Sequence, residues 1–426
     1  MRNFLFSALL AASAITSPAA NVIFIHPDGA GISHWQAARF LWAGPDGELN
    51  WDRLPNVAIY RGQMKNSLTA TSNGGATTHA YGIKVPAAAF GTDGIKPDRP
   101  AAASGKAGSL MHEAMERGVK VGIVNSGSVI EPGTACFLAS VAKRDDYADI
   151  TKQIVNSGAD VILSGGEEWF LPEGKAGRHT AAGKRTDGLD LIEAAQSKGY
   201  TVVYTAAELT AVPAGTKKLL GIFAVEDTFN DMGEAEMAAL KLPPYKPTAP
   251  TLAEMTSAAL KVLAPGPFLL VVEEEGADNF GNANNAAGTL EALRRADEAF
   301  GVALGFVEKN PETLLITAAD SSAGNMDVIG IDSSPEKLAI AKNQRDRNGA
   351  PYSLAQDGKP FVSKPDRFGE THLFVINWGT LLDASGGIVV RGAGKNADAI
   401  RGSFDNTRIY SLMRETLFGK EPASAK

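Results

Sequence analysis

The 426-residue chain has a single cysteine, six histidines and no excess of positive charge. Cys136 has no second cysteine with which to form an intramolecular disulfide, and its small apolar neighbours are typical of a buried residue. The formal net charge is -7, and no basic stretch is interleaved with aromatic residues, so a nucleic-acid-binding surface is not expected. Beyond the N-terminal region no apolar run is long enough to span a membrane. The sequence also lacks internal repeats and low-complexity tracts.

The composition is that of a globular protein. Hydrophobic residues make up 44% of the chain and charged residues 21%, which argues against wholesale disorder. The length suits one large α/β enzyme with insertions. We therefore expect one α/β domain over residues 21–420.

The N-terminus has the pattern of a secretory signal peptide. Arg2 supplies a positive charge, the run from Phe4 to Ile15 is apolar, and small residues follow up to Ala20. A membrane anchor is the alternative, but the apolar run is shorter than the roughly 20 residues that a bilayer requires. We expect residues 1–20 to be a cleaved signal and the protein to be periplasmic or secreted.

Short runs rich in valine and isoleucine alternate with amphipathic stretches along the chain. The amphipathic stretches include Leu252–Leu263 and Leu290–Glu308. The candidate strands are Val22–Ile25, Val119–Val124, Asp160–Leu163, Thr201–Tyr204, Leu219–Ala224, Phe268–Glu273, Leu314–Thr317, Leu373–Asn377 and Ile388–Arg391. The alternation predicts an open, mostly parallel central sheet with helices on both faces.

One segment lacks this rhythm. From about Asn343 to Glu370 the chain is rich in glycine, proline, aspartate, lysine and arginine, with little periodicity. We expect a surface insertion at about residues 340–371, and insertions of this length often serve as lids or interfaces.

Three of the candidate strands run into carboxylates. Asp28 follows the first strand, Glu273 and Asp278 lie at the end of a later one, and Asp320 follows another. Each acid alone could simply cap the next helix. Three such ends on one sheet would bring like charges together, which is costly without a cation. The pattern therefore favours a metal site over three independent caps.

A run of small residues from Thr69 to Thr77 surrounds Ser72. Its two glycines suggest a turn that enters a helix, where free N–H groups bind anions and a hydroxyl could attack phosphorus. The alternative is an ordinary serine or threonine helix cap.

Together these segments resemble the alkaline phosphatase family, and their order along the chain agrees. The resemblance extends from about Asn21 to Leu417. Its motifs are Asp28-Gly29, Ser72 through Gly82-Ile83-Lys84, Glu131 through Phe137 with Arg144, Gly177-Arg178-His179, Arg185 through Gly188, Glu273 with Asp278, Asp320, Trp378-Gly379-Thr380 and Asp405-Asn406-Thr407.

The resemblance implies a phosphomonoester hydrolase with Ser72 as its covalent nucleophile. Arg144 and the backbone N–H of Asn73 would bind the phosphate group. Two or three divalent cations would be held by Asp28, Ser72, Glu131, Glu273, Asp278, Asn282, Asp320, Ser321 and Asp383.

The chain departs from the family's pattern where three histidines normally bind two catalytic zinc ions. Asn282, Ser321 and Asp383 stand in those places, and all three offer oxygen. Oxygen donors suit Mg²⁺, Ca²⁺ or Mn²⁺ better than Zn²⁺. Thr71 replaces the usual acid before the nucleophile, which predicts a less firmly oriented Arg144. Gly133 stands where a threonine normally completes a magnesium shell.

The histidines do not restore the zinc ligands. His79 lies about 10 Å along a helix from Ser72, and His26 is expected to be a buried core residue. A sulfatase is disfavoured, because no cysteine or serine is followed by x-Pro-x-Arg. A phosphodiesterase and a non-catalytic exported protein that binds phosphate or cations remain alternatives. We expect small phosphate esters as substrates. The sequence does not determine the oligomeric state, and a homodimer is one of the options.

Overall fold

A computed structural model of the chain describes residues 20–420, except 97, 265, 333, 335–344 and 346–348. The predicted signal peptide, apart from Ala20, and part of the predicted insertion therefore lie outside the described residues. Within the described ranges, no helix combines the length and the apolar character needed to cross a bilayer.

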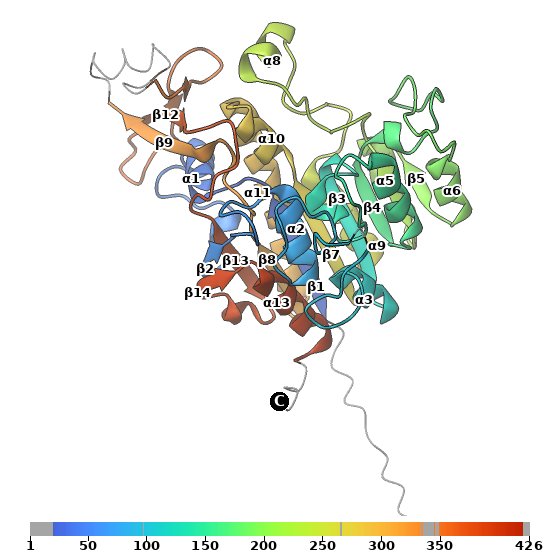
Figure 1. The fold of residues 1–426 in the computed structure, drawn as a ribbon. Coiled ribbons are helices and arrows are strands. Elements are labelled where there is room, and N and C mark those ends of the chain that lie inside the picture. The colour runs from blue at the N-terminus through green and yellow to red at the C-terminus, as the bar shows by residue number, and fades with distance from the viewer. Residues whose placement is uncertain are drawn as a thin grey trace, which may run out of the picture.

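The core of the molecule is a ten-stranded sheet, which confirms the predicted fold class (Figure 1). Its order is β14-β2-β13-β8-β1-β7-β3-β4-β6-β5. The strands are β1 Asn21–Pro27, β2 Asn56–Arg61, β3 Lys120–Ser128, β4 Val161–Gly165, β5 Thr201–Val203, β6 Leu219–Ile222, β7 Phe268–Glu274, β8 Thr313–Thr317, β13 Val389–Gly394 and β14 Gly402–Asp405. β13 is antiparallel to both of its neighbours, β2 and β8, and the other described pairs in this sheet are parallel.

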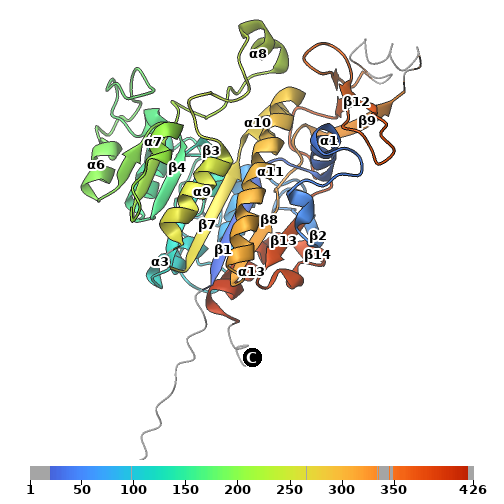
Figure 2. The same cartoon turned by 180° about the vertical axis from the view of Figure 1, so that it is seen from behind.

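Helices cover both faces of this sheet, as predicted. α9 (Leu252–Leu263) and α11 (Ala286–Lys309) pack on one face (Figure 2), and α2 (Ser72–Tyr81), α3 (Leu110–Glu116) and α13 (Thr407–Phe418) lie on the other. The remaining described α-helices are α1 Ile32–Trp42, α4 Pro132–Ala135, α5 Tyr147–Asn156, α6 Leu191–Ser197, α7 Ala206–Thr210, α8 Glu234–Leu240 and α10 Gly276–Asn282. The central strands read as continuous apolar runs because both of their faces are buried: β1, β7 and β8 have fully buried centres.

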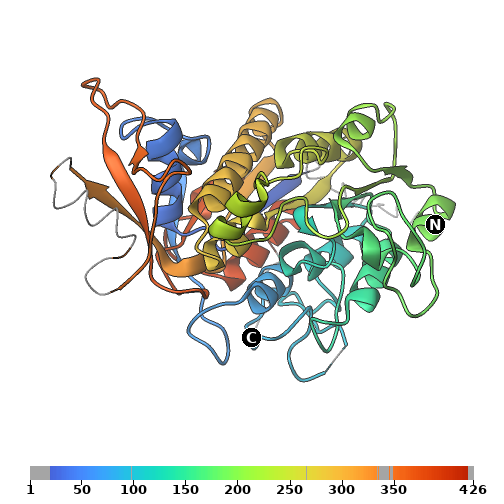
Figure 3. The same ribbon diagram turned by 90° about the horizontal axis from the view of Figure 1, so that it is seen from above.

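A second, smaller sheet lies at one end of the molecule, beside α1 (Figure 3). It consists of β9 Met326–Ile331, β10 Tyr352–Ser353, β11 Phe361–Val362 and β12 Leu373–Trp378, all antiparallel to their partners. Phe374, Ile376 and Trp378 of β12 pack with Ala37 of α1 in a separate apolar cluster.

Placing Leu373–Asn377 among the strands of the central sheet was therefore wrong. Its residues alternate between a face packed on α1 and the opposite face, and they pair with β9 rather than with a core strand. The predicted insertion is also more ordered than its composition indicated, because β10 and β11 lie within it.

Candidate active site

Carboxylates gather where β1, β7 and β8 end. β1 lies between the other two strands, with Phe24 in register with Val271 of β7 and Ile316 of β8. Asp28 follows β1 directly, Asp320 lies three residues beyond β8, and both are buried. The carboxyl ends of adjacent parallel strands thus bring the predicted acids to one edge of the sheet.

Ser72 is the first residue of α2 and is not its cap. The capping residue is Thr71, whose hydroxyl accepts a 3.4 Å hydrogen bond from the N–H of Gly74 and donates to the carbonyl of Ala87 at 2.6 Å. The N–H groups of Ser72 and Asn73 precede the first intrahelical bond, which joins Gly75 to Thr71. This leaves the Ser72 hydroxyl at the mouth of an anion-binding helix terminus.

Two glycines let these elements approach closely. A β-carbon at Gly75, in the first turn of α2, would lie 2.5 Å from the β-carbon of Asp320 and 2.6 Å from its Oδ2. Gly29 follows Asp28 with φ of +67°, and a β-carbon there would lie 2.6 Å from Oδ1 of Asp278. Both positions therefore require glycine.

Asn282 joins the carboxylates of Asp278 and Asp383, two of the predicted metal ligands. Its Nδ2 donates to both oxygens of Asp278, at 3.1 and 3.2 Å, and to Oδ1 of Asp383 at 3.0 Å. Its Oδ1 accepts from the backbone N–H of Gly324 at 3.0 Å. Because a backbone N–H only donates, this bond fixes the amide with its nitrogen toward the carboxylates. Asn282 can offer oxygen to a cation there only if its amide turns over.

Arg144 has two partners, both predicted site residues. It donates to Glu131 at 2.8 Å and to the side-chain oxygen of Asn73 at 3.4 Å. Glu131 thus positions the guanidinium, whereas the Thr71 hydroxyl is engaged with Ala87. The predicted loosening of Arg144 is offset by this ion pair.

Glu273 occupies the space that a side chain at Gly133 would need. A β-carbon on Gly133 would lie 1.8 Å from Oε1 of Glu273. The other carboxylate oxygen accepts from the N–H of Thr134 at 2.9 Å and from Nδ2 of Asn125. Glu273 therefore fills the space that a threonine side chain at residue 133 would take.

Glu275 is a site residue that the sequence reasoning missed. It is buried, its carboxylate influences the pKa values of both Glu131 and Glu273, and its Oε2 has no hydrogen-bond partner. A β-carbon at Gly127 would touch the side chains of Glu131 and Glu275 alike, at 3.0 Å. Its signal in the sequence is the run of three glutamates at the end of β7, of which alternate residues share one face.

Crowding raises the proton affinity of these acids. Burial raises the pKa of Asp278 and of Asp320 well above the ordinary aspartate value, and the Asp28 and Asp383 carboxylates raise it further. Burial also raises the pKa of Glu273 to about 8. Asp28 differs: burial alone would raise its pKa, but the neighbouring His26 lowers it. Such a cluster is stable as anions only beside a positive charge.

The unpaired atoms in this cluster fit divalent cations. Buried polar atoms without a hydrogen-bond partner include Oδ2 of Asp28, both carboxylate oxygens of Asp320 and the hydroxyl of Ser321. Oε1 of Glu273 is another. Buried oxygens normally find partners, so a group of buried oxygens without hydrogen bonds is typical of a cation-binding site.

Other motifs of the resemblance serve the fold. Lys84 bonds the side chain of Asn406 and so ties the segment after α2 to the exit of β14. Arg185 is buried and donates to the carbonyls of Ala148 and Trp169. None of these contacts reaches the carboxylate cluster.

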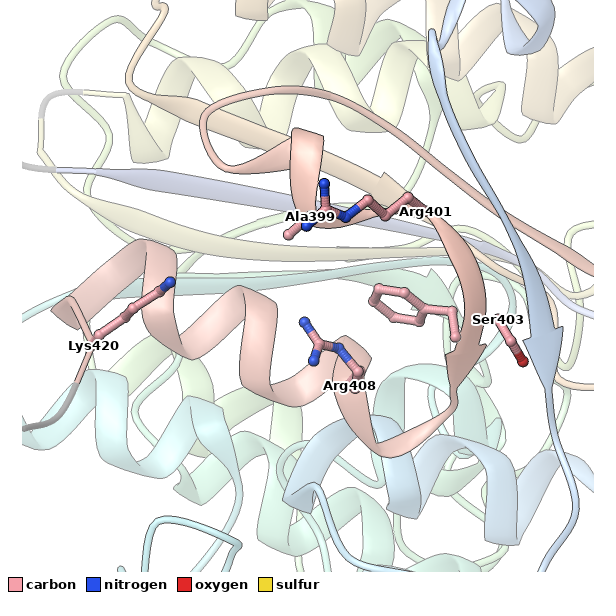
Figure 4. Close-up of a pocket in the computed structure, with 6 residues that line it drawn as sticks. Ala399, Arg401, Ser403, Arg408 and Lys420 are labelled. Atoms are coloured by element: carbon pink, nitrogen blue, oxygen red, sulfur yellow. The ribbon is translucent and has the colours of Figure 1, made fainter. Parts of the chain in front are cut away.

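A cavity of about 320 Å³ between β14 and α13 is separate from the predicted site residues (Figure 4). It is lined by Arg401, Arg408 and Lys420 among others, and none of the acids described above contributes to it. It adds a basic surface hollow but no part of the carboxylate cluster.

Known proteins of one family are similar to this chain. The sequence model of the family described as alkaline phosphatase matches residues 19–362, most of the chain. The chain is 28% identical to alkaline phosphatase of Escherichia coli over 381 residues, covering 80% of this chain and 78% of that protein. It is also 28% identical to alkaline phosphatase H of Pseudomonas aeruginosa over 381 residues, covering 79% and 76%.

Solved structures share the fold. Alkaline phosphatase from Thermus thermophilus superposes with a TM-score of 0.71 at 24% identity, over 94% of this chain and 92% of that one. Alkaline phosphatase from the Antarctic bacterium TAB5 gives 0.71 at 20% identity, over 94% and 99%. A mutant of the TAB5 enzyme with magnesium bound in its M3 site gives 0.70 at 22% identity, over 94% and 98%.

The family match ends before Asp383, so the assignment of Asp383 to the candidate site depends on its hydrogen bond with Asn282. The other residues of the candidate site, including Ser72 and the carboxylates at the strand ends, lie within the matched range. This chain belongs to the alkaline phosphatase family, and it is an enzyme of the metal-dependent phosphomonoesterase type.

Proposed function

We propose that this enzyme hydrolyses phosphate monoesters through a phosphoserine on Ser72, with hard divalent cations bound chiefly by oxygen. The observation that carries the proposal is the position of Ser72. Because Thr71 caps α2, the Ser72 side chain at the amino end of the helix is not used as a cap. The Ser72 side chain interacts with the Asp28 carboxylate and helps to lower its pKa.

Three cation positions follow from the residues. Asp28 and Asp320, with Ser72 and Ser321, would hold the first cation. Asp278 and Asp383 would hold the second, joined by Asn282 if its amide turns over. Asp28, Glu131 and Glu273 surround a third. Bound cations of this kind lower the pKa of a hydroxyl or water and neutralise developing negative charge on the entering and leaving oxygens.

The chain's own groups bind and orient the ester. Arg144, held by Glu131, can take two phosphate oxygens with its paired N–H groups. The N–H groups at the start of α2 add donors to the same phosphate. These contacts would bring phosphorus in front of Oγ of Ser72, a residue with 7% of its surface exposed.

The reaction then proceeds in two displacements. The Ser72 oxygen loses its proton and forms a bond to phosphorus while the bond to the ester oxygen breaks, and the alcohol leaves with a proton. Water next attacks phosphorus from the vacated side, the bond to Oγ breaks, and inorganic phosphate leaves as Ser72 regains its proton.

The preference for hard cations rests on three residues. Where the resemblance implies histidines, Asn282, Ser321 and Asp383 offer amide, hydroxyl and carboxylate groups. Mg²⁺, Ca²⁺ and Mn²⁺ suit such oxygens, whereas zinc sites are usually built from histidine and cysteine. We further propose that residues 1–20 are a signal peptide and that the mature enzyme acts on small phosphate esters in the periplasm or outside the cell.

Reconstitution with single ions tests this proposal. Chelator-stripped enzyme is assayed with an aryl phosphate monoester and with the corresponding diester after addition of Mg²⁺, Ca²⁺, Mn²⁺ or Zn²⁺. We expect monoester turnover to return with the hard cations and little to return with zinc. Preferential diester turnover would favour the phosphodiesterase alternative, and full activity with stoichiometric zinc would overturn the cation assignment alone.

A further inference from the structure

His26 stands beside the carboxylate cluster. It is the penultimate residue of β1, Asp28 follows that strand directly, and the two side chains lie 3.4 Å apart. In the neighbouring strand β7 its register partner is Glu273. All three side chains are fully buried. The expectation of an ordinary core histidine does not account for this placement.

The orientation of the imidazole is fixed by one hydrogen bond. Nδ1 lies 2.7 Å from the carbonyl oxygen of Ala318, and because a carbonyl only accepts, Nδ1 carries the hydrogen. Nε2 has no hydrogen-bond partner and lies 3.4 Å from Oδ1 of Asp28. Nε2 therefore faces a carboxylate, and this arrangement requires a positive charge at the nitrogen, supplied either by a proton or by a metal ion.

The three side chains offer three ligand atoms close to one another. One such atom from each of His26, Asp28 and Glu273 lies within 4.8 Å of the other two. Asp28 and Glu273 each retain a carboxylate oxygen without a partner. The contact of Nδ1–H with a backbone carbonyl is the support that metal-bound histidines commonly have.

We propose that His26, Asp28 and Glu273 form a mixed nitrogen and oxygen site for a divalent transition-metal ion. This inference rests on the proposed function, because Asp28 and Glu273 are there assigned to the third cation. Glu131, the remaining acid of that assignment, has an oxygen engaged by Arg144 at 2.8 Å, and His26 takes its place as ligand. An imidazole favours first-row transition ions over Mg²⁺ and Ca²⁺, so this position differs from the two oxygen-lined ones.

Anomalous diffraction from the unmutated protein tests the site directly. The enzyme is crystallised with Mn²⁺ in the presence of a large excess of Mg²⁺, which competes for the oxygen-lined positions. We expect an anomalous peak to persist within bonding distance of Nε2 of His26 and of both carboxylates. A peak elsewhere only, with Nε2 paired to Asp28 alone, would show that a proton supplies the positive charge and would overturn the site.

Pulsed electron paramagnetic resonance gives a second readout that does not depend on turnover. Mn²⁺ bound to the unmutated protein should show nitrogen coupling, which changes pattern when the histidines are labelled with ¹⁵N. His26→Gln should remove the coupling and one Mn²⁺ per chain. His79→Gln is the matched control: its ring lies 5.6 Å from that of His26, its Nε2 is bonded to Tyr60, and the coupling should remain.

These outcomes separate the site from the catalytic proposal. If His26→Gln does not fold, the labelled spectrum of the unmutated protein still decides, and absence of nitrogen coupling there overturns the inference. Nitrogen coupling in a protein whose Ser72→Ala variant keeps full turnover would overturn the phosphoserine mechanism and leave the site standing.

Discussion

Gly75 lies directly against the carboxylate of Asp320, at a distance that leaves no room for a methyl group. A β-carbon at residue 75 would come within 2.5 Å of the β-carbon of Asp320. The first turn of α2 therefore rests on Asp320, three residues beyond β8, and we expect this contact to position Ser72 relative to the predicted cation ligands.

Gly75→Ala should lower activity without unfolding the protein. The added methyl group must displace α2 or Asp320, and a misplacement of about 1 Å at a catalytic group can cost about 100-fold in rate. We expect kcat/KM to fall by at least about tenfold in a steady-state assay. Gly305→Ala is the control, because α11 leaves open space at that residue, and it should add about 0.5–1 kcal/mol of stability with activity unchanged. Unchanged activity in Gly75→Ala would show that this contact does not position the nucleophile.

Arg144→Ala should weaken phosphate inhibition and slow turnover together. A hydrogen bond to a charged group contributes about 1.5–3 kcal/mol, so we expect a loss of roughly 10- to 150-fold in kcat/KM. Arg144→Lys should recover only part of it, because an ammonium lacks the paired donors. Arg178→Ala, which removes an exposed arginine paired with Glu208, should have little effect. An unaltered inhibition constant for phosphate in Arg144→Ala would remove this residue from the site.

The core strands could be predicted from the sequence, because strands buried on both faces consist of uninterrupted apolar residues. The predicted Phe268–Glu273 became β7 Phe268–Glu274, and Leu252–Leu263 was confirmed as α9. β14 was missed because Phe404 is its one large apolar residue. β2 contains the apolar run Val57–Tyr60, a strand signal that the sequence analysis overlooked. β12 was assigned to the wrong sheet because period and composition do not reveal which strand is the partner.

The site could be predicted only as far as the resemblance and the strand ends reached. Asp28 and Asp320 were visible as acids after apolar strands. Glu275 was hidden in a run of glutamates, and the orientation of the Asn282 amide depends on the backbone of Gly324, which is distant in sequence. Such contacts arise from the tertiary fold, and no local pattern carries them.

Without cations, the enzyme should lose stability as pH rises. The Glu273 carboxyl has a folded pKa of about 8 against an ordinary value of 4.5, and burial also raises the pKa of Asp278 and Asp320. Between these values the unfolded chain has released protons that the folded chain retains, so the free energy of unfolding falls with increasing pH. Thermal unfolding in chelator should give a lower Tm at pH 8 than at pH 5, and saturating Mg²⁺, Ca²⁺ or Mn²⁺ should remove most of the difference. A chelated protein that is more stable at pH 8 would contradict the carboxylate cluster as described.

Replacing the three residues that differ from the family's zinc-binding histidines by histidine should change the metal preference. In Asn282→His, Ser321→His and Asp383→His combined, imidazoles replace oxygen donors, which should shift reconstitution from the hard cations toward Zn²⁺. Metal analysis after dialysis, followed by assay with each ion, measures the shift. Single substitutions should give mixed sites with low activity. If the unmutated enzyme already retains stoichiometric zinc with full activity, the oxygen-donor argument is wrong.

The central claim is that Ser72 carries the phosphate during turnover. Enzyme mixed with radiolabelled phosphate or an aryl phosphate at low pH, quenched in acid and digested, should yield a labelled peptide with phosphate on Ser72. Ser72→Ala should show neither label nor monoester turnover. Thr71→Ala, which removes the helix cap and the hydrogen bond to Ala87, should still be labelled at Ser72. Label on Thr71, or near-normal turnover in Ser72→Ala, would contradict the account.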